Sequence, residues 1–367
     1  MFIFVLLTYR KEFSVSSVGK TFFVIAKYLL ILFVLIIFSA ADLNAQSKNI
    51  QQNKEDLLGG FTKGVAYSGF RHGQHPDRGN GAVNPTDEET LEDLNILSRN
   101  SNFGLIRLYD SQENSEAVLK AIKENNINIK VMLGIWLKAE VSNHEGCSWI
   151  TEPIPDEVLK QNKKDNLLEI ERAVKLANGY KDIVIAVNVG NEALVSWNDH
   201  MMEVDTVISY VRKVKKSISQ EVTVADNYDW WAKHGSKLAK ELDFISVHTY
   251  PVWEEKDINE GLSYTIENVQ AVRNALPDSR IVISELGWAT EASEFGERAS
   301  EEKQLQYYSE VTDWASKMNI TTFWFEAFDE DWKGETANPL GAEKHWGLFT
   351  VNRKAKLVMH ELYPDLK

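Results

Sequence analysis

Eight short apolar runs alternate with amphipathic segments along most of the chain, and this alternation constrains the fold more than any other feature. The runs have the length and the β-branched and aromatic content of buried strands. Strands that alternate with helices indicate a parallel α/β fold. Eight such units over roughly 250–300 residues are typical of the (β/α)8, or TIM, barrel. The expected strands are residues 63–68, 105–110, 129–136, 183–192, 222–227, 244–250, 280–288 and 321–329.

Helical periodicity fills several of the intervening segments, and Thr86 with Glu89 forms an expected capping box at the start of the first one. No G-x-G-x-x-G follows the first strand, so little favours a dinucleotide-binding sheet. We therefore predict a single α/β barrel domain over residues 61–367. The expected helices are residues 86–100, 115–126, 167–180, 204–219 and 302–318.

The N-terminal segment has the pattern of an export signal. Basic residues precede an apolar run at residues 28–38, and small residues follow it. The run is shorter than the roughly 20 residues that a membrane-spanning helix needs. We predict a signal peptide over residues 1–45, with an uncleaved membrane anchor as the alternative, followed by a polar linker at 46–60. The mature protein is accordingly expected to be exported, to the periplasm, the cell surface or the medium.

Charge and cysteine content exclude several classes of protein. The formal net charge is -14, so neither nucleic acid nor an anionic membrane is an expected partner, and a neutral substrate fits better. Cys147 is the single cysteine, which leaves no intrachain disulfide. His72, His75 and Asp77 are interpreted as a solvated loop rather than a metal site. No cofactor, no metal and no stable protein partner are expected.

Polar and aromatic residues collect at the carboxyl ends of the expected strands, where TIM barrels carry their active sites. Glu192 and Glu285 end the fourth and seventh apolar runs, and an ionised carboxylate in such a place needs a reason. Paired carboxylates across one mouth are the machinery of glycoside hydrolysis. Tryptophans also follow most of the strand ends, and a flat indole can pack on a sugar ring.

Five ordered motifs complete this pattern, and with them the chain resembles glycoside hydrolase family 17, the β-1,3-glucanases and glucanosyltransferases of the retaining clan A. The resemblance extends from about residue 60 to residue 366. The motifs are LIRLYD (105–110), VMLGIW (131–136), VGNE (189–192), ISELGW (283–288) and FDEDWK (328–333).

The resemblance implies that Glu192 is the acid/base and Glu285 the nucleophile. It also implies that Asn191 binds the sugar 2-hydroxyl and that Tyr250 holds the nucleophile through its hydroxyl. The remaining residues expected to bind substrate are Tyr67, Arg107, Tyr109, Trp136, Asn227, Trp288, Phe328, Glu330 and Lys333.

Three functions stay open at this point. The first is a retaining endo-β-1,3-glucanase that hydrolyses laminarin-like glucan through a covalent glucosyl-enzyme. The second is a β-1,3-glucanosyltransferase, in which a sugar acceptor replaces water. The third is a glucan-binding protein without catalysis, which the presence of both glutamates argues against. Two long polar segments, 64–81 and 138–160, depart from the plant members of the family and leave the preferred glucan length undetermined.

Overall fold

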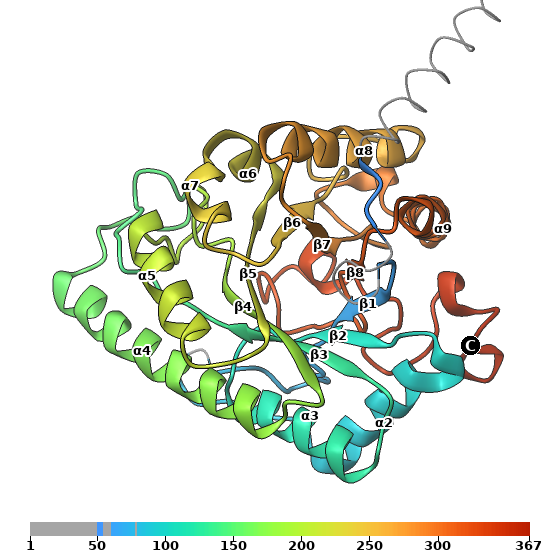
Figure 1. The fold of residues 1–367 in the computed structure, drawn as a ribbon. Coiled ribbons are helices and arrows are strands. Elements are labelled where there is room, and N and C mark those ends of the chain that lie inside the picture. Colours follow the sequence, from blue (N-terminus) through green and yellow to red (C-terminus); the bar gives the residue numbers. More distant parts are fainter. Residues whose placement is uncertain (1–49, 54–59, 78) are drawn as a thin grey trace, which may run out of the picture. The chain divides into compact units, whose positions relative to one another are not determined.

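The computed structural model describes residues 50–53, 60–77 and 79–367, and within them eight parallel strands close into a barrel. Each strand pairs with the next one along the chain, and β1 pairs with β8 (Figure 1). The predicted TIM barrel is thus confirmed. The strands are β1 (Lys63–Ala66), β2 (Leu105–Arg107), β3 (Lys130–Ile135), β4 (Val184–Asn191), β5 (Glu221–Asn227), β6 (Ile245–Thr249), β7 (Ile281–Leu286) and β8 (Thr322–Trp324).

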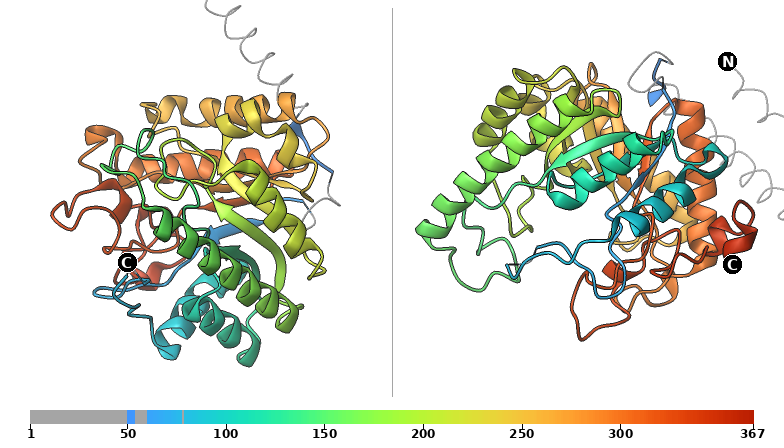
Figure 2. Two further views of the ribbon diagram at one scale, coloured as in Figure 1. Left: turned by 90° about the vertical axis from the view of Figure 1, so that its left-hand side faces the viewer. Right: turned by 90° about the horizontal axis from the view of Figure 1, so that it is seen from below.

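Helices connect the strands and lie outside the barrel in each view (Figures 1 and 2). The predicted capping box is present, because Thr86 and Glu89 exchange side-chain to backbone hydrogen bonds at the start of α2. Short 3-10 turns occupy parts of the loops near the C-terminus. The helices are α2 (Asp87–Ser98), α3 (Glu113–Glu124), α4 (Asp156–Gly179), α5 (Val204–Lys215), α6 (Tyr228–His234), α7 (Ser236–Ala239), α8 (Ile258–Ala275) and α9 (Glu301–Met318).

Two of the longer helices differ from the prediction, and the short helices α6 and α7 were not predicted either. α4 begins at Asp156 rather than near residue 167, in a stretch that is too polar to show an apolar stripe. Its first turns instead hold the loop after β3, because Asn162 and Asn166 bond the backbone of that loop. α8 was not predicted, because its buried face includes polar residues such as Asn268 and Gln270, which obscure the helical periodicity.

The barrel interior has an apolar floor with polar groups above it. Leu105 belongs to a small buried cluster inside the barrel, and Arg107, two residues further along β2, reaches across the barrel to β7. Phe244 and His248 show the same alternation around β6. Residues two apart on a strand face the same side of the sheet. The apolar residues of the floor and the polar residues above them therefore all face the barrel interior. The other members of the floor are Met132, Ala186, Val282 and Phe323.

The start of the compact unit lies earlier than residue 61. Ile50 is fully buried, and Gln52 exchanges two hydrogen bonds with the backbone of Ile281 at the start of β7. Residues 50–53, expected within a linker, therefore pack against the barrel. The expected signal segment, residues 1–45, lies outside the described residues. Among the residues that are described, no helix is long and apolar enough to span a membrane.

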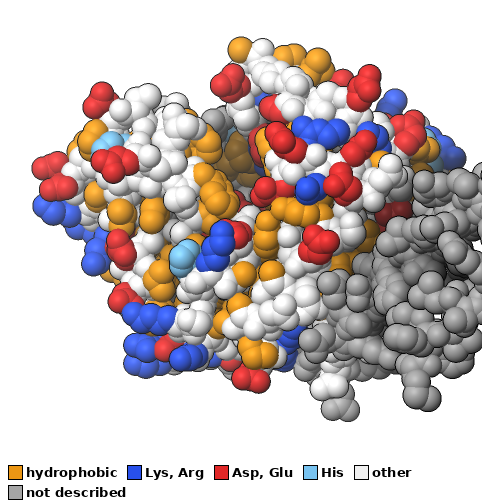
Figure 3. All heavy atoms as spheres, turned by 90° about the horizontal axis from the view of Figure 1, so that it is seen from above, with side chains coloured by type: hydrophobic (Ala, Val, Ile, Leu, Met, Phe, Trp, Pro, Cys, Tyr) orange, Lys and Arg blue, Asp and Glu red, His pale blue; other side chains and the backbone are white. Residues whose placement is uncertain are grey.

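The surface of the barrel unit carries mixed charge on the face seen in Figure 3, where acidic and basic side chains are interspersed with hydrophobic and neutral ones. Such a distribution is typical of a solvated surface rather than of a one-sign binding patch.

Candidate active site

Glu285, near the end of β7, has a carboxylate that is enclosed by hydrogen-bond donors. Arg107 Nη1 lies 2.7 Å from Oε1, and the Tyr109 hydroxyl donates to the same oxygen over 2.9 Å. The Tyr250 hydroxyl donates to Oε2 over 2.7 Å. The Glu285 side chain is only 7% exposed, so these donors replace the water that burial removes and stabilise the charged form.

The pKa of Glu285 lies below the ordinary glutamate value. Burial alone raises this pKa, but His248, the Arg107 guanidinium and the hydroxyls of Tyr250 and Tyr109 together outweigh it. The carboxylate is therefore ionised at neutral pH. An ionised carboxylate is the form that a nucleophile requires.

Glu192 follows β4 directly and has a backbone conformation that is rare for a glutamate. Its φ is 47°, in the left-handed region, and Gly190 just before it has a φ of 87°. The turn is held in place, because the Glu192 N–H donates to Ala225 O over 2.9 Å and the Asn198 amide donates to Glu192 O. A non-glycine residue held in this region costs on the order of 1–3 kcal/mol, and such strain clusters at functional sites.

Asp226 fixes the same turn from β5. This residue is fully buried, and its carboxyl oxygens accept from the backbone N–H groups of Leu194 and Asn227. Burial, and then the charge of Glu192, raise the pKa of Asp226 well above its ordinary value. Both effects disfavour a second full charge beside Glu192.

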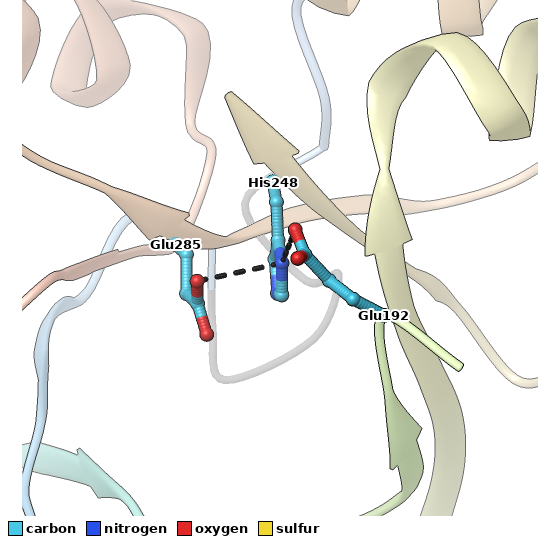
Figure 4. A group of neighbouring side chains, drawn as sticks. All are labelled: Glu192, His248 and Glu285. Atoms are coloured by element: carbon cyan, nitrogen blue, oxygen red, sulfur yellow. Dashed lines mark hydrogen bonds and ion pairs between the residues drawn. The ribbon is translucent and has the colours of Figure 1, made fainter. Parts of the chain in front are cut away.

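His248, on β6, lies between the two glutamates (Figure 4). Its Nδ1 is 2.9 Å from Glu192 Oε1 and 3.4 Å from Glu285 Oε2. One oxygen of each glutamate and one histidine nitrogen all lie within 4.8 Å of one another. This close approach fits a retaining glycosidase, whose carboxylates lie about 5–5.5 Å apart, better than an inverting one, with about 6.5–9.5 Å.

These three side chains also have the composition of a metal site, so we tested this reading against their contacts. Arg107 already presents a cation to Glu285, and His248 Nδ1 already pairs with Glu192 Oε1. A metal ion would have to displace both. The contacts fit proton transfer and covalent catalysis better than metal binding.

Glu330 and Lys333 lie in a second buried charged group, which follows β8. Lys333 Nζ is 2.5 Å from Glu326 Oε2 and 2.8 Å from Glu330 Oε2, and Ser68 donates to Glu330. Burial raises the pKa of Glu326 well above its usual value. At Glu330 burial acts in the same direction, but Lys333 and the neighbouring hydrogen bonds overcome it and lower the pKa.

Trp136 and Asn191 lie on the side of the site that carries Glu192. Trp136 is 37% exposed, and its ring stacks on His200 with 4.6 Å between centroids. His200 Nε2 in turn lies 2.8 Å from Asn191 O, which joins this aromatic pair to the end of β4. Asn191 Oδ1 accepts from Arg107 Nη2, so its amide nitrogen is the group left to donate.

Asn227, expected to bind substrate, has a structural role as well. Its side-chain oxygen accepts from the N–H of Asp229 and caps α6. The residue is partly exposed.

Three of the expected substrate contacts have side chains that lie in the interior, and their contact with sugar stays a prediction. Trp288 has no exposed surface; it packs on Tyr307 and donates its indole N–H to Arg298 O. Tyr67 is buried, with its hydroxyl on Asp93. Phe328 is buried beneath the Arg353 guanidinium. Large aromatic residues after a strand end can pack under loops, and sequence position alone does not separate the two cases.

His248, Asp226 and Glu326 were not singled out as site residues in the sequence. For His248 a signal existed: it stands two residues before Tyr250, so the strand period places both on the same face. Asp226 also stood at an expected strand end. Glu326 lies within the expected eighth strand and was hidden among apolar residues.

The closed barrel and the two adjacent carboxylates, one buried among donors and one partly exposed, together define a TIM-barrel glycoside hydrolase of the retaining type. The chain belongs to the family of the BtgE/BtgC glycoside hydrolase domain, whose model matches residues 64–347. The resemblance to glycoside hydrolase family 17 is consistent with this match and is thereby confirmed.

Known proteins give the same result. A glucan 1,3-beta-glucosidase of Arthroderma benhamiae is 25% identical over 268 residues, which cover 68% of this chain and 78% of that protein. The crystal structure of an endo-laminarinase from Formosa Hel1_33_131 is 27% identical, with a TM-score of 0.71, and covers 87% of this chain and 89% of that one. A glycoside hydrolase family 17 β-1,3-glucanosyltransferase from Rhizomucor miehei shares the fold, with a TM-score of 0.61, 24% identity, and coverage of 81% and 96%.

Proposed function

We propose that this chain is a retaining endo-β-1,3-glucanase that hydrolyses laminarin-like glucan by double displacement. The observation that carries the proposal is the approach of the Glu192 and Glu285 carboxylates to within 4.8 Å of each other and of His248. The names of two similar proteins, a glucan 1,3-beta-glucosidase and an endo-laminarinase, support a β-1,3-linked glucan as substrate.

In the first step an oxygen of Glu285 bonds the anomeric carbon while the bond from that carbon to the glycosidic oxygen breaks. Glu192 gives its proton to the departing oxygen. In the second step a water oxygen bonds the anomeric carbon, the ester bond to Glu285 breaks, and the water proton returns to Glu192. Arg107, Tyr109 and Tyr250 hold the Glu285 carboxylate ready for attack.

Several residues are proposed to contact the sugar chain. The free amide nitrogen of Asn191 is placed to donate to the 2-hydroxyl of the sugar that becomes bonded to Glu285. Trp136 and the partly exposed Asn227 would contact sugars on the leaving-group side, since both follow the strands that flank Glu192. Lys333 with Glu330 would line the opposite side of the mouth. Each of these contacts predicts an altered KM when the side chain is shortened.

Trp136 and its neighbours favour glucanosyl transfer to a sugar acceptor as the second candidate activity. Trp136 has exposed ring surface, and its ring packs against His200, which contacts the backbone of Asn191. An acceptor sugar bound there would compete with water for the covalent intermediate. Trp136→Ala is therefore expected to lower the ratio of transfer to hydrolysis by about 10-fold, since burying a large apolar side chain is worth on the order of 1.5–3 kcal/mol.

A linear β-1,3-glucan hexasaccharide, followed over time by mass spectrometry, tests the proposal. Only shorter oligosaccharides mean hydrolysis, and products longer than six units mean transfer. NMR of the first product shows the anomer: a β-anomer supports retention, and an initial α-anomer would overturn the double displacement. If folded protein cleaves no β-1,3-glucan, the enzyme proposal fails, and the glucan-binding protein without catalysis is the function that remains.

Export of the mature protein is also proposed, on the composition of residues 1–45. N-terminal sequencing of protein recovered from the medium, the periplasm or the membrane fraction tests it. A start near residue 46 supports a cleaved signal, and an intact N-terminus in the membrane fraction supports an anchor.

A further inference from the structure

The two ring nitrogens of His248 face partners of opposite kinds. Nε2 lies 3.2 Å from Arg107 Nη1, and Nδ1 lies 2.9 Å from Glu192 Oε1. A guanidinium can only donate hydrogen bonds, so Nε2 must offer its lone pair to a shared Arg107 hydrogen. The ring hydrogen then belongs to Nδ1. Arg107 thus fixes the ring hydrogen on Nδ1, from which His248 donates to Glu192.

From this geometry we propose that His248 is a positioning residue that determines which oxygen of Glu192 carries the transferable proton. The inference rests on the proposed function, since it assigns a role within that reaction. Because Oε1 accepts the hydrogen bond from His248, the acidic proton is placed on Oε2. Within the described part of the chain no hydrogen bond reaches Oε2, so this oxygen is available to the leaving group.

His248 keeps this role through both steps. When Glu192 Oε2 gives its proton to the glycosidic oxygen, the Nδ1–H bond to Oε1 stabilises the new carboxylate. When water or an acceptor hydroxyl attacks, its proton returns to the same Oε2. The Nδ1–H neither leaves nor is consumed, so His248 acts through Glu192 without exchanging a proton with the substrate.

The surrounding structure leaves His248 no other conformation to adopt easily. The ring is fully buried. The pairing of β6 with β7 shifts register between Val247 and His248, and such irregularities re-aim side chains next to active sites. The 3.4 Å contact of the same Nδ1 with Glu285 Oε2 points the N–H into the space between the carboxylates.

Two substitutions distinguish the contribution of Nδ1 of His248 from that of Nε2. An asparagine amide can place an N–H near the Nδ1 position, whereas a glutamine amide reaches the Nε2 position. His248→Asn therefore keeps the donor to Glu192 and loses the contact with Arg107; His248→Gln does the reverse. The readout is kcat/KM, which reports the first step, for two substrates: a β-1,3-glucan hexasaccharide and a dinitrophenyl β-laminaribioside, whose leaving group needs no proton.

His248→Gln is expected to lower kcat/KM for the hexasaccharide by about 100-fold, the effect of a misplaced catalytic group. The aryl substrate should lose only about 3-fold, because no acid is needed there. His248→Asn should recover most of the hexasaccharide rate. Equal losses on both substrates, or no difference between the two variants, would overturn the inference. An inactive wild-type protein would instead refute the proposed function and leave the variants uninformative about catalysis.

A measurement on the wild-type protein keeps the inference testable if the variants do not fold. In 15N-histidine-labelled protein, His248 should show a one-bond coupling to hydrogen at Nδ1 and none at Nε2, at neutral pH. The histidine resonance that shifts in Arg107→Lys is assigned to His248, because Arg107 contacts its Nε2. A hydrogen on Nε2 alone would contradict the tautomer and with it the placement of the Glu192 proton.

Discussion

Glu285 and Glu192 carry the same carboxyl group, yet they differ in burial, in hydrogen bonding and in backbone conformation. Glu285 lies on a regular strand, is almost fully buried and receives hydrogen bonds from an arginine and two tyrosines. Glu192 stands on a strained turn, keeps 26% of its side chain exposed and is bonded through its carboxylate to His248. The surroundings and not the side chain distinguish the two residues, because the donors around Glu285 stabilise its anion.

Removing the proposed nucleophile is the strongest test of this comparison. Glu285→Gln keeps the shape of the side chain but cannot form the ester, so kcat should fall by about 10⁴-fold or more for any glucoside. Release of dinitrophenol and cleavage of the hexasaccharide should fall together. Appreciable activity in a preparation free of wild-type protein would remove Glu285 from this role.

Removing the acid/base should have a large but selective effect. Glu192→Ala should lower kcat/KM for natural glucan by about 10²–10⁴-fold, the usual contribution of general acid catalysis. The first step with a dinitrophenyl glycoside should be largely spared. Azide, which needs no base, should then restore turnover and give a β-glucosyl azide. If both substrates suffer equally and azide has no effect, the assignment of the two glutamates is wrong.

Weakening the donors around Glu285 should shift its titration. Tyr250→Phe removes a hydrogen bond that lowers the pKa of Glu285, so that pKa should rise and the acidic limb of the kcat/KM profile should move to higher pH. A hydrogen bond to a charged group is worth roughly 1.5–3 kcal/mol, so the loss at neutral pH is about 10–100-fold. Tyr109→Phe is the matched variant for the other oxygen.

The same pKa shift predicts a stability effect with a defined sign. Because the folded pKa of Glu285 is depressed, the ionised group stabilises the fold above the unfolded pKa, and this contribution is lost as the pH falls through the folded value. Tyr250→Phe should therefore lose less stability than the wild type on acidification. Denaturant unfolding at neutral and acidic pH measures the difference.

The sequence predicted the positions of the two glutamates but not the difference between their surroundings. The positions of both at strand ends, and the barrel itself, followed from period-two apolar runs, since these report which strands are buried. Their environments did not follow. Arg107 acts on Glu285 from the far side of the barrel, and such a contact depends on the strand register and not on local sequence.

The aromatic residues show the same limit. Trp136 and Trp288 each follow an apolar run, and the sequence predicted that both contact sugar. Trp136 is exposed at the mouth, whereas Trp288 turns outward to pack on α9 through Tyr307. Which side of the sheet an aromatic residue takes depends on the bend after the strand, which composition does not report.

The smallest expected effect tests whether the turn at Glu192 is strained at all. Glu192→Ala and Glu192→Gly both remove the carboxylate, so both lose the bond to His248. They differ in how they tolerate a φ of 47°: the left-handed region costs an L-residue roughly 1–2 kcal/mol and glycine almost nothing. The glycine variant should therefore be the more stable of the two by about 1 kcal/mol in urea unfolding.

A helical position gives the matched control, because the order should reverse there. Lys213 is exposed within α5, and in a helix interior glycine is less stable than alanine by about 1 kcal/mol. The alanine variant should thus be the more stable at residue 213 and the less stable at residue 192. If alanine is preferred at both sites, Glu192 is not held in a left-handed turn, and the strain that distinguishes it from Glu285 does not exist.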